Sequence, residues 1–169
     1  MNMKTKTQKI VISAMLAAFT AVATMAIKMP SPMGGYINLG DALVLFSGWF
    51  ISPLYSFLAA GIGSALADIL LGYAAYAPAT FVIKGLMAVT AHIFFRLLEK
   101  KFMSLSSLFI SGALAELVMI FGYYLFEAVF FYGFMASAAN IPANIMQAIF
   151  SLLMGALITN AFNKKNLSI

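Results

Sequence analysis

Long apolar stretches, separated by short segments rich in proline, glycine or charge, make up almost the whole chain. A helix needs about 20 mainly apolar residues to cross the hydrocarbon core of a bilayer. The stretch at 39–51 is too short to cross upright without help from its neighbours. The pattern predicts an all-α membrane protein with six transmembrane helices in a single domain, 1–169. The apolar stretches cover about residues 8–27, 39–51, 54–71, 79–98, 105–132 and 138–162.

Eight of the ten basic residues lie in three groups at the ends of these stretches. Short loops rich in Lys and Arg stay in the cytoplasm during membrane insertion. Each group therefore indicates a return to the cytoplasm, which places both termini inside and the loops at 28–38, 72–78 and 133–137 outside. The count of six crossings agrees with this topology. The three groups are Lys4, Lys6 and Lys9; Arg96, Lys100 and Lys101; and Lys164 and Lys165.

Composition supports a membrane protein and excludes several other classes. Hydrophobic residues make up 63% of the chain and charged residues 9%, which is untypical of a soluble protein. The net charge of +5 lies beside the spans, so it indicates topology and contact with anionic lipid rather than nucleic-acid binding. The apolar stretch 10–27 is longer than a cleaved signal segment, so we expect a retained first helix. The absence of cysteine excludes disulfides, thiolate metal sites and a cysteine nucleophile.

With this topology, most polar side chains within the spans lie towards the outer face. Ionisable groups in the hydrocarbon cost about 2.5–3.5 kcal/mol each on insertion scales, so they face the bundle interior or water. Such a cluster predicts an outward-facing pocket for a small, planar ligand that forms hydrogen bonds. The predicted binding residues are Tyr36, Asn38, Asp41, Tyr73, Tyr76, Lys84, Tyr123, Glu127, Asn140 and Asn144.

Structural roles remain open for several of these residues. Asp68 and Lys84 lie at similar depth on adjacent helices, and a mutual ion pair would lower their insertion cost; ligand contact is the alternative. The tyrosines could form an ordinary interfacial belt. Asn140 and Asn144, four residues apart on one helix face, could instead hold helices together.

The first helix carries a stripe of small residues. Ala14, Ala17, Ala18 and Ala21 share one face because their spacing follows the helical repeat. Small residues let helix backbones approach closely in membranes. The stripe could therefore serve either internal packing or docking of a partner helix.

Several functional motifs are missing from the sequence. No G-x-x-x-x-G-K-[ST] phosphate loop, H-E-x-x-H or G-x-S-x-G is present, and the chain has a single histidine, His92. We therefore expect no catalytic residue, metal site or cofactor, and no nucleotide hydrolysis by the chain itself. Transport against a gradient would need an ion gradient or a separate energising subunit.

Three segments resemble one family of transport proteins. The stretch Gly-Tyr-Ile-Asn-Leu-Gly-Asp-Ala at 35–42 is similar to the segment around loop one in the S components of energy-coupling factor (ECF) vitamin transporters. Residues 61–85, with Tyr-Ala-Pro-Ala-Thr at 76–80, resemble the helix-three to helix-four block of the same family. The Ala-x-x-x-Ala spacings of the first helix resemble its docking motif. The resemblance is strongest over 34–85.

The resemblance implies a six-helix bundle in the plasma membrane of a prokaryote. Such an S component binds a vitamin or precursor near the outer face, docks through the alanine stripe on a transmembrane coupling subunit driven by two ATPase subunits, and topples to release the ligand inside. By resemblance, loops one and three and the outer ends of helices four to six contact the ligand. The similar subfamilies favour a vitamin B6 (pyridoxine-type) or hydroxymethylpyrimidine ligand, with riboflavin or another vitamin as the alternative.

Two other functions are compatible with the sequence. A solitary transporter could use an ion gradient, with Asp68, Lys84, Glu116 and Glu127 relaying protons. An intramembrane enzyme or a scaffold without ligand is the other possibility; for an enzyme, activity would depend on His92 or Glu116.

Overall fold

The computed structural model describes residues 5–31, 36–99 and 104–166. The described part is mainly helical and carries one small antiparallel hairpin. The elements are α1 (Lys6–Ala26), β1 (Lys28–Pro30), β2 (Tyr36–Asn38), α2 (Gly40–Phe50), α3 (Pro53–Leu70), α4 (Ala77–Leu98), α5 (Ser104–Glu127), the π-helical η1 (Ala128–Tyr132), α6 (Gly133–Ser137), the 3₁₀-helical η2 (Ala138–Asn140) and α7 (Ile141–Asn166).

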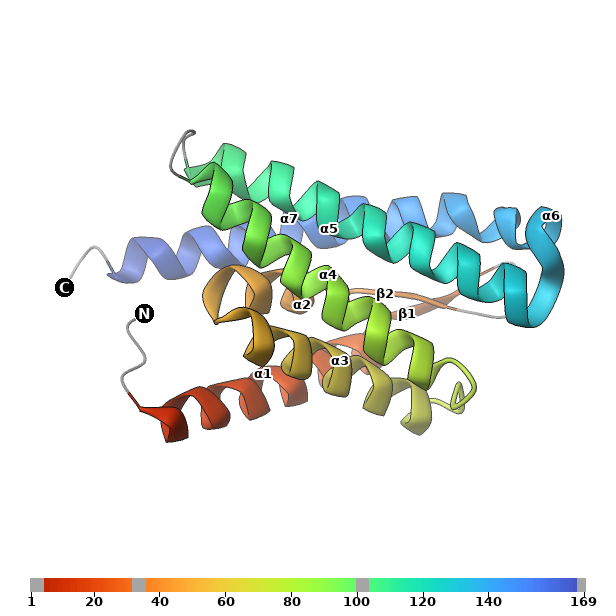
Figure 1. Cartoon of the computed structure of the whole chain (residues 1–169), viewed down its shortest axis with the longest axis horizontal. Helices are drawn as coiled ribbons and strands as arrows, with labels where there is room; N and C mark the ends of the chain where they lie inside the picture. The colour runs from red at the N-terminus through yellow and green to blue at the C-terminus, as the bar shows by residue number, and fades with distance from the viewer. Residues whose placement is uncertain (1–4, 32–35, 100–103, 167–169) are drawn as a thin grey trace.

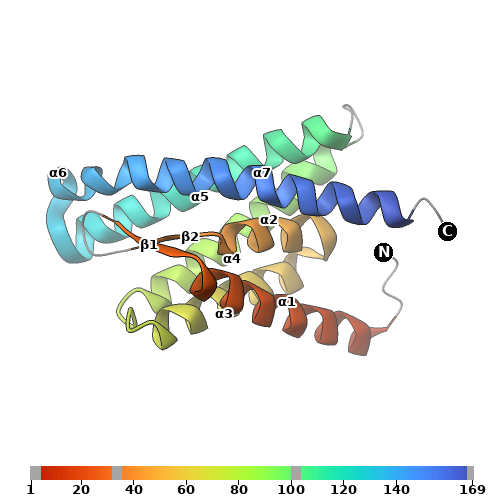
Figure 2. The ribbon, with the colours of Figure 1, turned by 180° about the vertical axis from the view of Figure 1, so that it is seen from behind.

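The long helices form a bundle around the short helix α2. Figure 1 shows α1 and α3 side by side along one edge and α5 and α7 along the other, with α4 between them. The start of α1 and the end of α7 lie at the same end of the bundle, and α6 lies at the opposite end, as Figure 2 also shows from behind. Helix α2 contacts α1, α3, α4 and α7, so it occupies the centre.

Local sequence signals account for the helix boundaries. Thr5 caps α1 and forms a reciprocal capping box with Gln8, which satisfies two free backbone N–H groups. Proline stands in the first turn of α3 and of α4, where no backbone donor is lost. Gly133 adopts a φ of 76°, a conformation that favours glycine, and the chain reverses there between α5 and α7.

Within the described ranges, four helical stretches are long and apolar enough to cross a membrane: Lys6–Ala26, Pro53–Leu70, Ala77–Leu98 and Leu105–Phe162. The last has 58 residues and contains both α5 and α7, which run back along each other. The 11 residues of α2 span about 16 Å, too little for the hydrocarbon core. The prediction of a helical protein with membrane-crossing segments is confirmed, whereas six crossings with cytoplasmic termini stay a prediction.

The segment predicted as a loop at 28–38 contains the β1–β2 hairpin. Lys28 pairs with Asn38, Met29 with Ile37, and Pro30 with Tyr36. The sequence pattern does not predict these strands, because each has only three residues and β1 contains a proline. Proline normally argues against a strand but is tolerated at a sheet edge. The hairpin matters because β2 places Tyr36 and Asn38 at the site described below.

The apolar core is centred on α2 and its neighbours α4 and α5. Leu45, Met87 and Met119 are fully buried there, and Trp49 belongs to the same cluster. The indole N–H of Trp49 donates to the Ser111 hydroxyl at 3.0 Å, so this polar group is satisfied within the core. This core packs α2 against α4 and α5.

Candidate functional site

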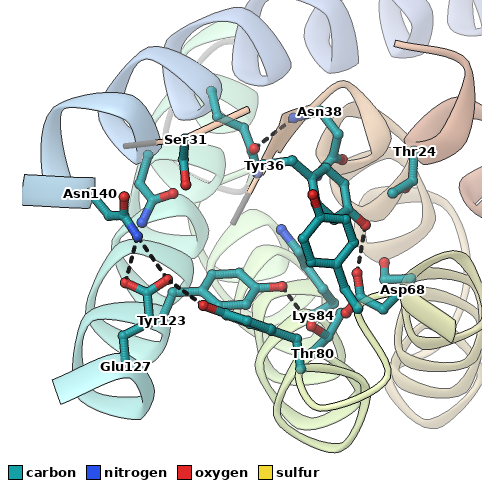
Figure 3. A pocket seen from close by; sticks show the side chains of 15 residues that line it. Thr24, Ser31, Tyr36, Asn38, Asp68, Thr80, Lys84, Tyr123, Glu127 and Asn140 are labelled. Atoms are coloured by element: carbon teal, nitrogen blue, oxygen red, sulfur yellow. Dashed lines mark hydrogen bonds between the residues drawn. The ribbon is translucent and has the colours of Figure 1, made fainter. Parts of the chain in front are cut away.

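A polar pocket lies beside the hairpin, at the end of the bundle where α5 turns back into α7 (Figure 3). Side chains from α1, the hairpin, α3, α4, α5, η2, α7 and the α3–α4 connection contribute to its wall. The enclosed volume is about 40 Å³, room for no more than a few water molecules. The lining residues are Thr24, Ser31, Tyr36, Asn38, Ser64, Asp68, Tyr73, Tyr76, Thr80, Lys84, Tyr123, Glu127, Asn140, Asn144 and Gln147.

Nine of the ten predicted binding residues line this pocket. They come from distant parts of the sequence, and the fold brings them together. The tenth, Asp41, is fully buried and supports Lys84 through an ion pair. Contact of these residues with a ligand stays a prediction.

Lys84 anchors a network of buried polar groups that joins four elements. Its ammonium pairs with Asp41 of α2, and both side chains are almost fully buried. Gln147 of α7 donates to the second oxygen of Asp41 at 2.6 Å and accepts from the backbone N–H of Asn38 at 2.8 Å. The Lys84 nitrogen also lies 5.1 Å from the centre of the Tyr123 ring. The network therefore ties the hairpin to the helices beneath it.

Of the two roles left open for Asp68 and Lys84, their mutual ion pair does not form in the described structure. Lys84 pairs with Asp41 instead, because α2 runs through the middle of the bundle and brings its own carboxylate to α4. Asp68 accepts a hydrogen bond from the Tyr36 hydroxyl at 2.5 Å. Its other oxygen, Oδ2, is buried and has no hydrogen-bond partner among the described residues. Depth along a helix could not show which neighbour each charged side chain faces.

Tyr36 belongs to a wall of aromatic rings over the pocket. The Tyr36 and Tyr73 ring centres lie 4.8 Å apart, and Tyr73 and Tyr76 meet edge to face at 6.4 Å. Burial, with the nearby Asp68 charge as the second cause, raises the pKa of the Tyr36 hydroxyl. Tyr36 therefore stays protonated and remains a hydrogen-bond donor at neutral pH.

A second carboxylate, Glu127, lies across the pocket from Asp68 (Figure 3). The Asn140 amide donates to both of its oxygens, at 2.9 and 2.8 Å, and the Tyr76 hydroxyl approaches one of them at 3.4 Å. Glu127 is the last residue of α5 before the π-helical η1. Single π-helical turns occur frequently at functional sites.

Several polar groups in the pocket have no protein partner. The hydroxyls of Thr24 and Ser31 are buried without a hydrogen bond to any described residue. Asn144 is half-buried, and its side chain forms no hydrogen bond within the described ranges. Buried polar groups are normally paired, so each of these is available to a ligand or to water.

The structure adds six lining residues to the predicted set: Thr24, Ser31, Ser64, Asp68, Thr80 and Gln147. Three of them carried a usable signal. Asp68 is an ionisable residue within a span, and the sequence already left ligand contact open for it. Thr80 precedes Lys84 by four positions and Gln147 follows Asn144 by three, so each shares a helix face with a predicted residue. The hydroxyls of Thr24 and Ser64 carried none, because small polar residues on apolar helices equally indicate packing.

Two further ionisable residues of the spans, Glu116 and His92, do not line this pocket, although Glu116 lies close enough to Asp41 and Lys84 to interact with their charges. Glu116 is buried in α5, and neither of its carboxyl oxygens has a partner among the described residues. His92 contacts the Gly48 carbonyl through Nδ1 at 2.9 Å. Within the described ranges, no group of three or more His, Cys, Asp or Glu residues could hold a metal ion.

The alanine stripe of α1 divides into an inner and an outer part. Ala21 is buried, and a Cβ atom added to Gly63 of α3 would lie 2.4 Å from the Ala17 carbonyl oxygen. This close approach shows internal packing of α1 on α3. Ala14 and Ala18 are exposed, and together with the half-buried Ala17 they line an apolar groove of about 420 Å³ between α1 and α3.

The sequence as a whole matches a known family. The model of the "ECF-type riboflavin transporter, S component" family matches residues 4–164. The chain belongs to the S components of ECF-type transporters. Members of this family are membrane transport proteins that bind a vitamin and work with an ECF module, and they are not enzymes. The predicted family and the expectation of a non-enzyme are therefore confirmed.

Individual relatives and solved structures agree with this family. This S component is 33% identical over 135 residues to an uncharacterized protein in the gap 3′ region of Pyrococcus woesei, covering 79% of this chain and 87% of that protein. Its fold resembles FolT bound with folic acid, with a TM-score of 0.71 at 15% identity over 94% of each chain. It also resembles the S component of a bacterial ECF transporter, with a TM-score of 0.70 at 18% identity over 95% of this chain and 98% of that one. The two structures support the S-component fold and leave the ligand of this chain open.

Proposed function

We propose that this S component captures a small vitamin-type heterocycle in the polar pocket and delivers it to an ATP-driven ECF module. The observation that carries the proposal is the convergence of aromatic rings, amides and charged groups on one pocket of an S-component fold. Stacking surfaces with a few directed polar groups are typical of sites for small planar ligands.

A single-ring ligand of the vitamin B6 or hydroxymethylpyrimidine type is the favoured substrate. The pocket has a volume of about 40 Å³, so binding of a vitamin requires part of the tyrosine wall to move. A ligand with one ring requires the smallest displacement of Tyr36, Tyr73 and Tyr76. Riboflavin is the second candidate because the matching family model carries its name; three fused rings would require a larger opening.

The proposed orientation places the pocket at the outer face of a prokaryotic plasma membrane, with six crossings and both termini inside. It is supported by the position of the lining residues near the end of α5 and the beginning of α7. Figure 1 shows that this end of the bundle lies opposite the start of α1 and the end of α7. The exposed Arg96, near the end of α4, is the described member of the central basic group. Lys4, Lys100 and Lys101 lie outside the described residues, and the side chains of Lys164 and Lys165 are not described.

The cysteine-free chain allows a direct test of this orientation. We expect Ala75→Cys, in the α3–α4 connection, to react with an impermeant maleimide added to intact cells. Lys6→Cys, at the start of α1, should react only after the cells are permeabilised. The reverse pattern would overturn the proposed topology.

The proposed partner surface is the exposed part of the alanine stripe, Ala14 and Ala18, together with the groove between α1 and α3. This surface would dock on the transmembrane coupling subunit, which two ATPase subunits energise. Ala17 and Ala21 are proposed to act indirectly, by holding α1 close to α3. Support comes from the small side chains and the apolar groove, which leave room for a partner helix.

The test of ligand binding starts from the detergent-solubilised protein. Mass spectrometry of small molecules that co-purify with it should detect one stoichiometric heterocycle. Calorimetric titration should then compare pyridoxine, hydroxymethylpyrimidine, riboflavin and folic acid. Tight binding of a one-ring compound supports the favoured substrate, and tight binding of riboflavin alone would replace it. A folded protein that binds no member of a vitamin panel would overturn the proposed function.

A further inference from the structure

The charge balance of the pocket bears on the kind of ligand it can hold. Asp68 and Glu127 line it from opposite sides, and Asp41 lies directly behind Lys84. Lys84 is the only lysine or arginine among the lining residues of the described chain, and Asp41 already pairs with it. Three carboxylates therefore meet one ammonium group, which leaves an excess of negative charge when all four are ionised.

The hydrogen bonds identify the two lining carboxylates as acceptors. Tyr36 donates to Asp68, and the Asn140 amide donates to both oxygens of Glu127. Tyr76 approaches Glu127 as a further donor. An ionised carboxylate is an acceptor only, so an arrangement in which neighbouring groups donate stabilises the charged form.

One acceptor position in this arrangement is vacant. Asp68 is buried, with only 4% of its surface exposed. The Thr80 hydroxyl is a donor near this carboxylate, but the Oδ2 atom itself makes no hydrogen bond of normal geometry to a described residue. Figure 3 shows Thr24 on the same side of the pocket as Asp68, and the Thr24 hydroxyl is also unpartnered in the described structure. A buried acceptor without a partner is costly, so a ligand that supplies a donor there gains affinity.

We propose that the pocket selects a heterocycle without negative charge that directs an N–H, O–H or ammonium donor at Asp68, and that it rejects phosphorylated or carboxylated forms. The inference rests on the proposed function and narrows its substrate class. The physical reason is that charges interact strongly in a buried, poorly solvated site. A phosphate group adds about −1.5 to −2 charges at neutral pH, in a pocket where the one ammonium is already paired.

Matched pairs of compounds test the inference because both members share the same ring. Calorimetric titration of the full chain in detergent would compare pyridoxamine with pyridoxamine 5′-phosphate, and riboflavin with flavin mononucleotide. We expect the unphosphorylated member of the binding pair to bind at least about 100-fold more tightly. Equal or tighter binding of the phosphorylated member would overturn the charge selection and leave the proposed function standing. If neither member of either pair binds, nor any other vitamin of the panel, the proposed function fails and this inference with it.

The variant Asp68→Asn isolates the carboxylate. It keeps an oxygen that can accept from Tyr36 but removes the negative charge. We expect it to weaken binding of the donor-bearing ligand by about 10- to 100-fold. The ratio between the affinities for the unphosphorylated and the phosphorylated compound should become smaller. Glu99→Gln is the matched control, because it removes one carboxylate from an exposed ion pair with Arg96 at the end of α4; both affinities should stay unchanged.

Folding is checked for each variant by its melting temperature and its elution in size-exclusion chromatography. If Asp68→Asn does not fold, Glu127→Gln replaces it in the experiment. This variant removes the negative charge on the opposite side of the pocket and keeps the shape of the side chain. A folded variant of either kind that keeps both the wild-type affinity and the wild-type discrimination would overturn the inference.

Discussion

The two ends of the bundle are held together by different interactions. At the pocket end, buried polar groups join β2, α2, α4 and α7, while the Asp68 Oδ2 atom and the hydroxyls of Thr24 and Ser31 have no hydrogen bond to a described residue. At the opposite end, Leu16, Phe46 and Ile51 pack in an apolar cluster. The ring centres of Phe46 and Phe50 lie 4.9 Å apart in a stacked arrangement, and the Phe162 ring contacts both.

The difference indicates which end can change during transport. A ligand with the right polar groups can replace hydrogen bonds one for one, so the pocket end can open and close again at modest cost. Close-packed apolar side chains have no such substitute, because separating them leaves cavities or exposes them to water. We therefore expect ligand-dependent rearrangement at the pocket end and a constant structure at the other.

The largest effect is expected from breaking the buried ion pair at the pocket end. Lys84→Met leaves the Asp41 carboxylate buried without its counter-charge, so the free energy of unfolding should fall by about 3–5 kcal/mol. Denaturant unfolding in detergent measures the change. The double variant Asp41→Asn with Lys84→Met is the control and should recover much of the loss. A single variant as stable as the double variant would contradict the role of the pair.

The matching change at the apolar end is Phe46→Ala. Removal of this buried ring leaves a cavity beside Phe50 and should lower the free energy of unfolding by about 3 kcal/mol. Ligand affinity, measured by calorimetry on the folded fraction, should not change, because Phe46 packs in the apolar cluster and does not line the pocket. A large loss of affinity with little loss of stability would show that the two ends are coupled.

The alanine stripe allows a comparison within one helix. Ala18→Trp places a large ring on the exposed side of α1, so we expect vitamin uptake by cells to fall at least about tenfold while ligand binding persists. Leu157→Trp on α7, at a position already exposed, is the control and should transport normally. Loss of ligand binding in Ala18→Trp would assign this side of the helix to internal packing instead.

The smallest effect is expected at Asn144. Its side chain forms no hydrogen bond to any described residue, so Asn144→Ala should leave the melting temperature nearly unchanged. If the amide contacts the ligand, Kd should rise about tenfold, the equivalent of one hydrogen bond lost from the complex. Gln147→Ala provides the contrast, because it also removes a partner of Asp41 and should lower stability. Unchanged affinity in Asn144→Ala would remove this residue from the site.

Periodicity and composition predicted most of the helix positions. The apolar stretches at 54–71 and 79–98 correspond to α3 and α4 to within two residues, because membrane helices must be apolar along their whole length. The same reasoning placed nine lining residues near one face, since polar side chains in a span are costly except where they meet each other or water. The hairpin was missed because three-residue strands leave no periodic pattern.

The sequence by itself determined the class of protein, its family and the helical stretches. It also determined the depth along the helices at which the polar side chains cluster. Each of these depends on local composition or on short motifs. Only the tertiary structure decided that Lys84 pairs with Asp41 rather than Asp68, that Tyr36 reaches Asp68 from the hairpin, and that the alanine stripe divides between packing and surface. These outcomes depend on which helix faces which neighbour. That arrangement follows from the packing of the whole bundle around α2, which no single segment encodes.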